Sequence, residues 1–455
     1  MKCGLVILQR NSNVKAMENT KKIKVVWICA VSNSDLRERL KYHNSWFNRF
    51  AFRLMGVDVN KKTDVAIWNT NGLLEFESFH DIELHVVCMT RFLNSKRQTF
   101  DKNTIHYHFL RDQNSSCIRF LFHQLFTRNS SRFHKNRRLI KKELELIKPD
   151  VVHIIGPENP YYSLALLDIS SQVPTIVQLQ ALLDRIKDVT RVDEEKKAFR
   201  YKGGVERDLF LKASYIGTTL KDFRDYIINN INPSARFLDL SLPMAQTIDL
   251  SECKKEYDFV YFASDISKAG EEAIQTFSLI HQRHPDLTLD VVGGYDPTFK
   301  TKLDAIIREN GMQQVVFFEG RLPSHDDVIK QIRKARFALI PLKMDFVPNT
   351  IRESMANGLP VITTITDGTP RLNLKRESVL LSPQDDFEAM ANNVELLLKD
   401  HNYAYTLREN AALTERERSN NHDIMDKWRM AYRAIVLNEV IDEKDVIQLT
   451  ETDIV

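Results

Sequence analysis

The stretch at residues 337–370 constrains the fold of this chain more than any other. An apolar run at 337–341 predicts a buried strand, and a loop containing Asp345 follows it. Residues 348–358 then read as a helix, and a second apolar run at 360–364 predicts another strand. Strands joined through a helix are the unit of a parallel sheet, which binds ligands where its strands end and its helices begin.

Two carboxylates in this stretch, Asp345 and Glu353, are eight residues apart. Asp345 lies in the loop before the predicted helix, and Glu353 lies in the first turns of that helix. The free N–H groups of a helix start attract an anion such as a diphosphate, and a nearby carboxylate can accept both hydroxyls of a ribose. The spacing therefore fits a nucleotide. From the spacing alone, a solvated aspartate and a surface glutamate remain the plainer interpretation.

The residues around this pair resemble a known site. The string PNTIRESMANGLPVITT, with GTP shortly after it, resembles the nucleotide-sugar site of retaining glycosyltransferases with the GT-B fold, the family four type called glycosyl transferases group 1. The hallmark of that site is Glu-x(7)-Glu followed by Ala-Met-x-x-Gly-x-Pro-Val. Asp345 stands at the first acid as a shortened variant. The positions that match in order are Glu353, Met355, Gly358, Pro360, Val361, Gly368 and Pro370.

The resemblance extends over about residues 22–436 and implies an α/β protein. Two Rossmann-like domains would place their parallel sheets facing each other across a cleft. A last helix would cross back to the first domain, anchored by Trp428 and Tyr432. Residues 1–21 are expected to be disordered or upstream of the true start. Residues 22–248 would form the acceptor-binding domain and residues 249–415 the nucleotide-sugar-binding domain. The returning helix would span residues 416–440, followed by a frayed tail at 441–455.

The resemblance also implies roles for individual residues. Asp345 would position the donor sugar, Lys268 would neutralise the diphosphate, and Glu353 would bind the ribose. Relatives place an arginine where this chain has Ser264 or Asp265, which puts ordinary donor binding in question, and a surface lysine explains Lys268 equally well. The other donor-binding residues that the resemblance implies are Pro348, Asn349, Thr350, Gly293, Gly320 and Arg321.

The resemblance implies no cofactor and no metal, because enzymes of this kind generally need no metal in the chemical step. Asp326 and Asp327 look like a metal-binding aspartate pair, but they open a predicted helix, so we interpret them as helix-capping residues. No G-x-G-x-x-G follows any predicted strand, which argues against a dinucleotide oxidoreductase.

Several polar residues are candidates for the acceptor side of the site. Ser32 and Asn33 follow the first predicted strand, where they bind hydroxyls or cap a helix, and the cap is the favoured interpretation. His153 lies on a predicted buried strand, so a core histidine is favoured there. Glu158 and Gln180 follow predicted strands, and a glutamine can bond a sugar hydroxyl but cannot supply acid–base chemistry.

Composition excludes several classes of protein. The chain has 455 residues, 43% of them hydrophobic and 27% charged, which is typical of a globular protein with two or three domains. A net charge of +3 argues against a dedicated nucleic-acid binder. The five cysteines are scattered without a C-x-x-C, which fits a reducing cytoplasm and excludes a zinc ribbon. No apolar run approaches the roughly 20 residues that cross a bilayer.

Residues 115–142 form the segment with the most unusual composition, and its basic residues lie at 119–142. No acid occurs between Asp112 and Glu143, and basic residues alternate there with apolar ones. A basic helix with an apolar face can lie on an anionic membrane, where each basic residue contributes about 1 kcal/mol. A core helix with a basic outer face explains the pattern equally well. We therefore expect a cytoplasmic protein, with peripheral contact to the inner face of the cell membrane as an open alternative.

These observations predict a glycosyltransferase that moves a sugar from a nucleotide diphosphate sugar to a hydroxyl of a glycan or lipid-linked acceptor. As the resemblance implies, the transfer would retain the anomeric configuration and serve cell-surface polysaccharide synthesis. The alternative is a catalytically degenerate relative that binds a nucleotide or a glycan as a scaffold. The shortened Asp345 and the missing arginine near Ser264 favour that alternative.

Overall fold

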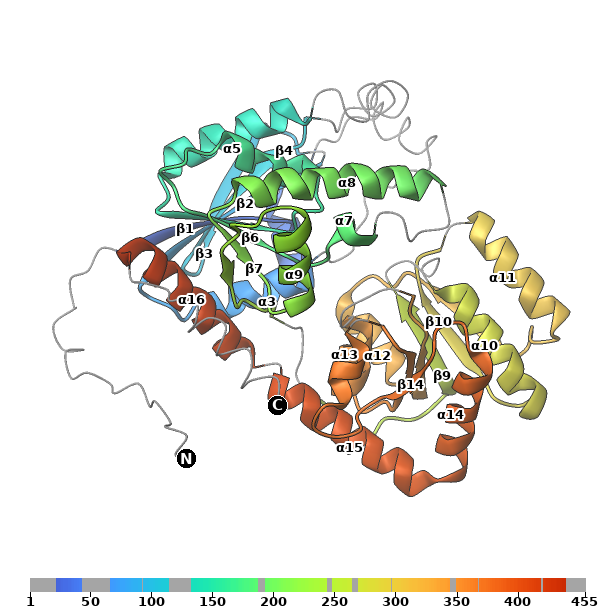
Figure 1. Ribbon diagram of the computed structural model, residues 1–455. Coiled ribbons are helices and arrows are strands. Elements are labelled where there is room, and N and C mark those ends of the chain that lie inside the picture. Colours follow the sequence, from blue (N-terminus) through green and yellow to red (C-terminus); the bar gives the residue numbers. More distant parts are fainter. Residues whose placement is uncertain are drawn as a thin grey trace, which may run out of the picture.

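The computed structural model shows two α/β domains, each built on one sheet with helices on its faces (Figure 1). The expected pair of parallel-sheet domains is thus confirmed. The expectations for residues 1–21 and 441–455 lie outside the described residues. The structure describes residues 22–42, 66–91, 93–113, 132–186, 193–243, 248–263, 269–295, 297–343, 349–366, 368–418 and 420–438.

The sheet of the first domain has the strand order β3-β4-β2-β1-β5-β6-β7-β8. Its neighbouring strands are parallel, except that β3 pairs with β4 in the antiparallel sense. The strands are β1 (Ile23–Ile28), β2 (Ile82–Thr90), β3 (Arg97–Lys102), β4 (Ile105–Arg111), β5 (Val151–Ile155), β6 (Thr175–Gln178), β7 (Tyr215–Gly217) and β8 (Phe237–Leu238). The helices are α1 (Ser34–Arg39), α3 (Ile67–Phe76), α5 (His134–Ile147), α6 (Pro160–Ser163), η2 (Leu164–Asp168), α7 (Leu183–Ile186), α8 (Asp193–Lys212) and α9 (Lys221–Asn230).

Alternate residues of β1 supply two separate cores, one on each face of the first sheet. Val25 and Trp27 belong to the core shared with α3, whereas Val26 and Ile28 belong to the core shared with α5. Side chains alternate between the two faces of a strand, so a strand that is covered on both sides must be apolar throughout. This requirement explains the continuous apolar run at the start of the domain.

The sheet of the second domain has the order β11-β10-β9-β12-β13-β14, and its strands are parallel. Because every strand runs the same way, all its carboxyl ends lie at one edge, where helix starts also gather. The strands are β9 (Tyr257–Ala263), β10 (Leu289–Gly293), β11 (Val316–Gly320), β12 (Ala335–Ile340), β13 (Val361–Thr364) and β14 (Leu380–Ser382). The helices are α10 (Gly270–Arg283), α11 (Pro297–Glu309), α12 (His325–Ile332), α13 (Asn349–Ala356), η4 (Thr369–Asn373), α14 (Phe387–Lys399), α15 (His401–Arg418) and α16 (Asn421–Leu437).

The last helix, α16, leaves the second domain and packs against the first sheet (Figure 1). The indole N–H of Trp428 donates to the carbonyl of Ser241 at 2.9 Å. The hydroxyl of Tyr432 lies 2.8 Å from Nε1 of Trp27 and 2.7 Å from Nδ1 of His153. Both anchoring side chains of α16 are buried. The fold of the first domain is therefore completed by the end of the chain.

None of the described helices is both long enough and apolar enough to span a membrane.

Truncating the main anchor of α16 should destabilise the protein. We expect Trp428→Ala to lower the free energy of unfolding by about 3–5 kcal/mol, because it leaves a large cavity and an unpaired carbonyl at Ser241. Urea unfolding followed by circular dichroism measures the loss.

Met430 offers a matched control on the same helix, since its side chain is 55% exposed. We expect Met430→Ala to change the free energy of unfolding by no more than about 0.5 kcal/mol. Equal losses in the two variants would show that α16 does not contribute to the core of the first domain.

Candidate functional site

The predicted donor residues gather at the carboxyl edge of the second sheet. Gly293 ends β10, Gly320 ends β11 and Arg321 follows it directly. Asn349 and Thr350 begin α13, the helix after β12. Asp345 and Pro348, in the loop after β12, lie outside the described residues, and so does Lys268, in the loop after β9. The strands that precede these residues, β9 and β12, are neighbours in the sheet.

Two glycines at this edge have backbone conformations that other residues rarely adopt. Gly293 has φ 143° and Gly320 has φ 70°, both in the positive range that favours glycine. A side chain at the next residue, Gly294, would place its Cβ only 2.8 Å from Nη2 of Arg321. The guanidinium of Arg321 therefore packs directly on the backbone that follows β10. The sequence alone had picked out both strand-end glycines, but not this contact.

Glu353 lies in α13 with its carboxyl group almost fully buried, since the residue is 8% exposed. The pKa of this carboxyl is raised to about 8, mainly by burial, with Arg352 opposing the shift and Glu415 adding to it. Arg352 is itself paired with Glu415, at 3.0 Å between Nη2 and Oε1. A carboxyl group held in such surroundings is typical of a functional site, although buried structural carboxyls also occur.

Sequence reasoning missed His325, the first residue of α12. Its Nε2 lies 3.6 Å from Oε1 of Glu353, so the starts of two helices bring an imidazole and a carboxyl together. The sequence did offer a signal for His325, because it lies shortly after Arg321 and begins the helix that follows β11. The neighbouring Asp326 and Asp327 lie in the first turn of α12, but the cap itself is Ser324, whose Oγ accepts the backbone N–H of Asp327 at 3.1 Å and donates to its carboxylate at 2.7 Å.

The structure places the acceptor-side candidates in different surroundings. Oδ1 of Asn33 caps α1 by accepting the N–H of Leu36 at 2.9 Å, and Oγ of Ser32 accepts from Arg37 at 3.1 Å, so the capping interpretation is confirmed. The acceptor-side assignment of His153 is wrong. Its imidazole is fully buried against Trp428, with ring centroids 4.5 Å apart, and therefore belongs to the core.

Glu158 and Gln180 remain at the carboxyl edge of the first sheet, after β5 and β6 respectively. Burial raises the pKa of Glu158 to about 7, and Asn159 donates to its Oε1 at 2.8 Å. A second buried carboxyl, Glu206 of α8, was not predicted, because nothing in its charged helix distinguishes it from a surface residue. Oε2 of Glu206 accepts the N–H of Asp184 at 3.0 Å, and burial raises its pKa to about 8.

Comparison with known proteins identifies the second domain. Residues 258–400 match the family model described as Glycosyl transferases group 1. Those residues form a glycosyltransferase group 1 domain. The protein WcaL of Salmonella typhimurium, whose name is that of a colanic acid biosynthesis glycosyltransferase, is 29% identical to this chain over 99 residues. The match covers 20% of this chain and spans about a quarter, 24%, of the length of WcaL. The protein of the same name from Escherichia coli is 29% identical over 102 residues.

Solved structures extend the likeness beyond the group 1 domain to nearly the whole chain. Sucrose-phosphate synthase from Thermosynechococcus elongatus has a TM-score of 0.65 at 15% identity, covering 92% of this chain and 100% of that one. A structure titled trehalose-6-phosphate from E. coli, bound with UDP-2-fluoro glucose, has a TM-score of 0.59 at 10% identity, covering 90% and 98%. These likenesses confirm the predicted GT-B fold, with the group 1 domain as its second half.

The raised pKa of Glu353 predicts a measurable pH dependence. Between its ordinary value of 4.5 and about 8, the folded protein holds a proton on Glu353 that the unfolded chain has lost. The stability contributed by this group therefore falls as the pH rises through that window. We expect Glu353→Gln to become more stable than the wild type by at least about 1.4 kcal/mol at pH 8.5, the value of one pKa unit, and to gain little at pH 4.5.

Urea unfolding of both proteins at several pH values measures this difference. Glu309→Gln is the control, since Glu309 is an exposed residue of α11, and its difference from the wild type should stay constant with pH. A constant difference for Glu353→Gln as well would show that the buried carboxyl does not titrate differently in the two states.

Proposed function

We propose that this protein is a retaining glycosyltransferase that moves a sugar from a nucleotide diphosphate sugar to an acceptor hydroxyl in the synthesis of a cell-surface polysaccharide. The observation that carries the proposal is the position of Glu353. It lies in the helix after β12, eight residues beyond Asp345, within a glycosyltransferase group 1 domain. The naming of WcaL for colanic acid biosynthesis supports the polysaccharide product.

In the proposed complex the nucleotide lies along the carboxyl edge of the second sheet. Glu353 accepts the ribose hydroxyls, and the backbone N–H groups at Asn349 and Thr350, near Pro348, hold the diphosphate with the positive end of α13. Arg321 and Lys268 add positive charge there. A guanidinium is suited to this role because it stays charged and binds phosphate oxygens in pairs. The trehalose-6-phosphate structure bound with UDP-2-fluoro glucose makes a UDP-sugar the first donor to test.

The proposed transfer is a front-face displacement. The acceptor hydroxyl attacks the anomeric carbon on the side from which the diphosphate leaves. The new glycosidic bond forms as the bond from carbon to the diphosphate oxygen breaks, and the leaving diphosphate takes the hydroxyl proton. Asp345 positions the donor sugar, so catalysis consists mainly of orientation and charge stabilisation, and the proposal requires no metal or cofactor. Glu158 and Gln180, at the carboxyl edge of the first sheet, are the proposed contacts for a glycan or lipid-linked acceptor.

Nucleotide binding tests the donor site. We expect one of UDP, GDP, ADP and CMP, or its sugar conjugate, to raise the melting temperature of the wild type. A ligand at 100 times its dissociation constant stabilises the folded state by about 2.7 kcal/mol. Glu353→Ala should lose that shift, because it removes the acceptor for the ribose hydroxyls. A thermal-shift titration measures both proteins, and transfer assays then use the nucleotide that binds.

Glu309→Ala serves as the control, because Glu309 is exposed in α11 of the same domain, and it should keep the full shift. A shift that survives in Glu353→Ala would rule out the ribose contact. If no nucleotide or nucleotide sugar produced a shift in the wild type, the proposed transferase would give way to a scaffold protein that has lost its donor.

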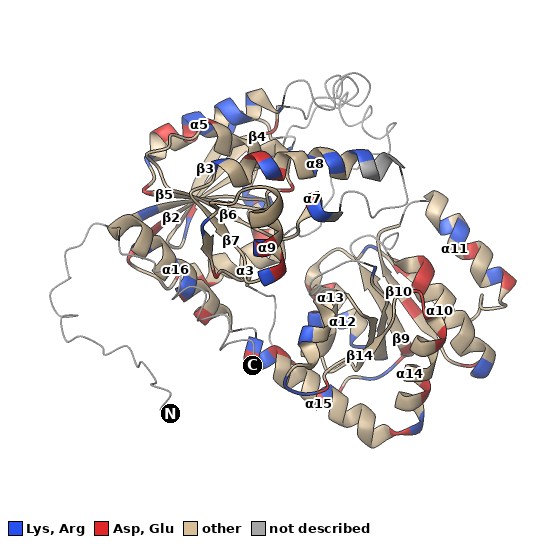
Figure 2. Cartoon of the chain, viewed as in Figure 1, with Lys and Arg blue, Asp and Glu red and all other residues tan. Residues whose placement is uncertain are grey.

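We also propose that the first domain contacts an anionic membrane surface through α5, on the cytoplasmic side where a lipid-linked acceptor would be presented. Ile140, Leu144 and Ile147 of this helix are buried in the core, so its apolar face is not available to a bilayer. Lys and Arg residues follow one another along most of α5, with acidic residues towards its end (Figure 2). The exposed basic residues of α5 are Lys135, Arg138, Lys141 and Lys142. The remaining contact is therefore electrostatic. Of the basic segment, residues 119–131 lie outside the described residues, whereas residues 132–142 are described.

Removing charge from α5 should weaken binding to anionic vesicles. Each basic residue near such a surface contributes about 1 kcal/mol, so Lys141→Gln with Lys142→Gln should weaken binding by roughly 30-fold at low salt. Sedimentation with vesicles that contain phosphatidylserine measures the bound fraction. The control double variant, Lys302→Gln with Lys399→Gln, removes two exposed lysines from the second domain and should bind as the wild type does. Equal recovery with neutral vesicles would exclude the contact.

A further inference from the structure

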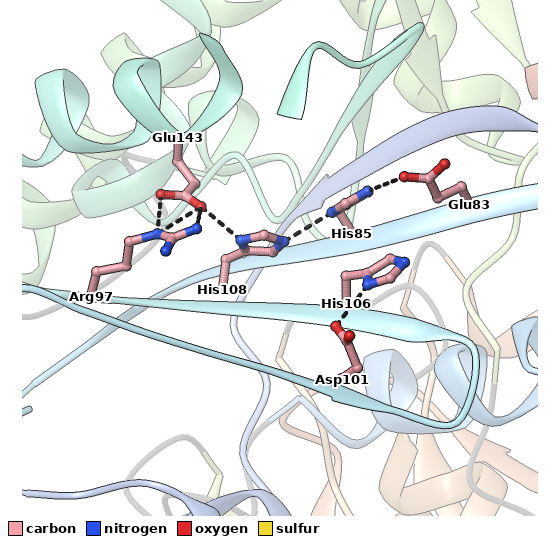
Figure 3. Close-up of polar contacts among 7 residues, drawn as sticks. All are labelled: Glu83, His85, Arg97, Asp101, His106, His108 and Glu143. Carbon is pink, nitrogen blue, oxygen red and sulfur yellow. Dashed lines mark hydrogen bonds and ion pairs between the residues drawn. The ribbon is translucent and has the colours of Figure 1, made fainter. Parts of the chain in front are cut away.

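Three histidines and two glutamates form a connected polar group on one face of the first sheet (Figure 3). Glu83 and His85 lie on β2, and His106 and His108 lie on the neighbouring strand β4, with His85 directly opposite His106. Glu143 reaches the group from α5, which covers this face. Both strands run in parallel, and the group lies near their starts, at the edge opposite to the carboxyl ends.

A chain of three close contacts runs through this group. Oε1 of Glu143 lies 2.7 Å from Nδ1 of His108. Nε2 of His108 lies 2.9 Å from Nδ1 of His85, and Nε2 of His85 lies 2.9 Å from Oε1 of Glu83. Arg97 donates from Nε and Nη2 to Glu143 at 2.8 Å, which fixes that carboxyl group as an ionised acceptor.

The number of ring hydrogens does not match the number of contacts. A neutral imidazole carries one N–H, so His108 and His85 together supply two hydrogens for three contacts. If Nδ1 of His108 donates to Glu143, its Nε2 accepts from Nδ1 of His85. Nε2 of His85 then presents a lone pair to the carboxylate of Glu83. Two acceptors facing each other at 2.9 Å repel, unless one of them takes up a proton or both move slightly apart to bind a metal ion.

The third histidine favours a metal ion at this position. The ring of His106 stacks on that of His85, with centroids 4.6 Å apart. Nδ1 of His106 lies 2.7 Å from Oδ1 of Asp101, so this bond directs the hydrogen to Nδ1 and leaves Nε2 as a lone pair. One ligand atom from each of Glu83, His85 and His106 lies within 4.8 Å of the others. Among the described residues, no other such group of three is found.

We propose that Glu83, His85 and His106 bind a divalent transition-metal ion, with zinc as the ion that fits the ligands best. Zinc takes imidazole nitrogens and carboxylate oxygens at about 2.0–2.2 Å, usually with four ligands in a tetrahedron. Such an ion holds its ligand atoms about 3.3 Å apart. The side chains of Glu83 and His106 are 31% and 37% exposed, so they have the freedom to move to that spacing. A water completes the tetrahedron.

The surroundings already provide the contacts that orient metal-binding histidines. Such histidines usually donate their other N–H to a carboxylate or another acceptor, which sets the tautomer and turns the free nitrogen toward the ion. Asp101 does this for His106, and His108 does it for His85. Lys24 competes for the site, since its ammonium group lies 3.2 Å from Oε1 of Glu83. Its side chain is 28% exposed and can turn toward solvent when the ion binds.

The ion would act as a clamp between two strands. Glu83 and His85 come from β2, whereas His106 comes from β4, so a bound ion ties the two strands together near their starts. The site lies at the edge of the first sheet opposite to the carboxyl ends, and no residue of the proposed donor site contributes to it. This inference therefore stands or falls separately from the proposed function.

Zinc binding to tag-free full-length protein, washed free of metal with a chelator, tests the proposal. We expect calorimetric titration to show one zinc ion per chain with a dissociation constant of micromolar or below, and a melting temperature that rises with zinc concentration. His106→Gln removes a ligand and should weaken binding by more than about 100-fold. Asp101→Asn keeps the ligands but loses the carboxylate that orients one of them, and should weaken binding by about 10–100-fold.

His284 provides the matched control. Its Nε2 lies 2.7 Å from Glu395, and its side chain is 38% exposed, much as His106 is. His284→Gln should bind zinc as the wild type does. Circular dichroism of the metal-free variants checks that each is folded. If His106→Gln does not fold, Asp101→Asn still tests the proposal, because Asp101 is exposed. The proposal is overturned if the wild type binds no stoichiometric zinc. A proton would then bridge His85 and Glu83 in place of a metal ion. The proposal is also overturned if both His106→Gln and Asp101→Asn bind as His284→Gln does.

Discussion

The buried hydroxyl of Tyr432 joins the beginning and the end of the chain. It accepts the indole N–H of Trp27 and donates to Nδ1 of His153, against which Trp428 packs. Burial lowers the pKa of His153 to about 3, so the ring stays neutral and Nδ1 remains the acceptor that the hydroxyl requires. Because α16 follows α15 of the second domain, this network ties the first sheet to the domain that carries the proposed donor residues.

The second constraint is the parallel direction of the strands in the group 1 domain. It brings residues that are far apart in the chain, such as Gly293, Arg321 and Glu353, toward one edge of a single sheet. A carboxyl group at such an edge can either remain solvated or be buried by the helices that begin there. Glu353 is buried, and burial raises its pKa, because the charged form of a carboxyl group is disfavoured away from water. Two ribose hydroxyls that donate hydrogen bonds to the carboxylate would offset the cost of burying it. A glutamate on the surface has no such cost, because water solvates it.

The sequence predicted those elements whose burial is uniform or whose ends are capped locally. The apolar run at Val361–Thr364 formed a strand, and Asn33 capped a helix, because each depends on near neighbours. The strand Arg97–Lys102 was missed, since it lies at the edge of the sheet and its exposed residues alternate with only partly buried ones. The contact between His85 and His106 depends on the register of two strands, which no local pattern specifies.

The resemblance implies an arginine near Ser264 that this chain lacks. We infer that Arg321 takes this part, because Gly294 has no side chain and the guanidinium packs on its backbone at the carboxyl edge of the sheet. Lys343, after β12, is a poorer candidate, since it already pairs with Glu272 in the first turn of α10. An acid at that helix start repels a diphosphate unless a cation offsets it. The positive charge that holds the donor diphosphate would then come from Arg321, directly after β11, as well as from Lys268 in the sequence after β9.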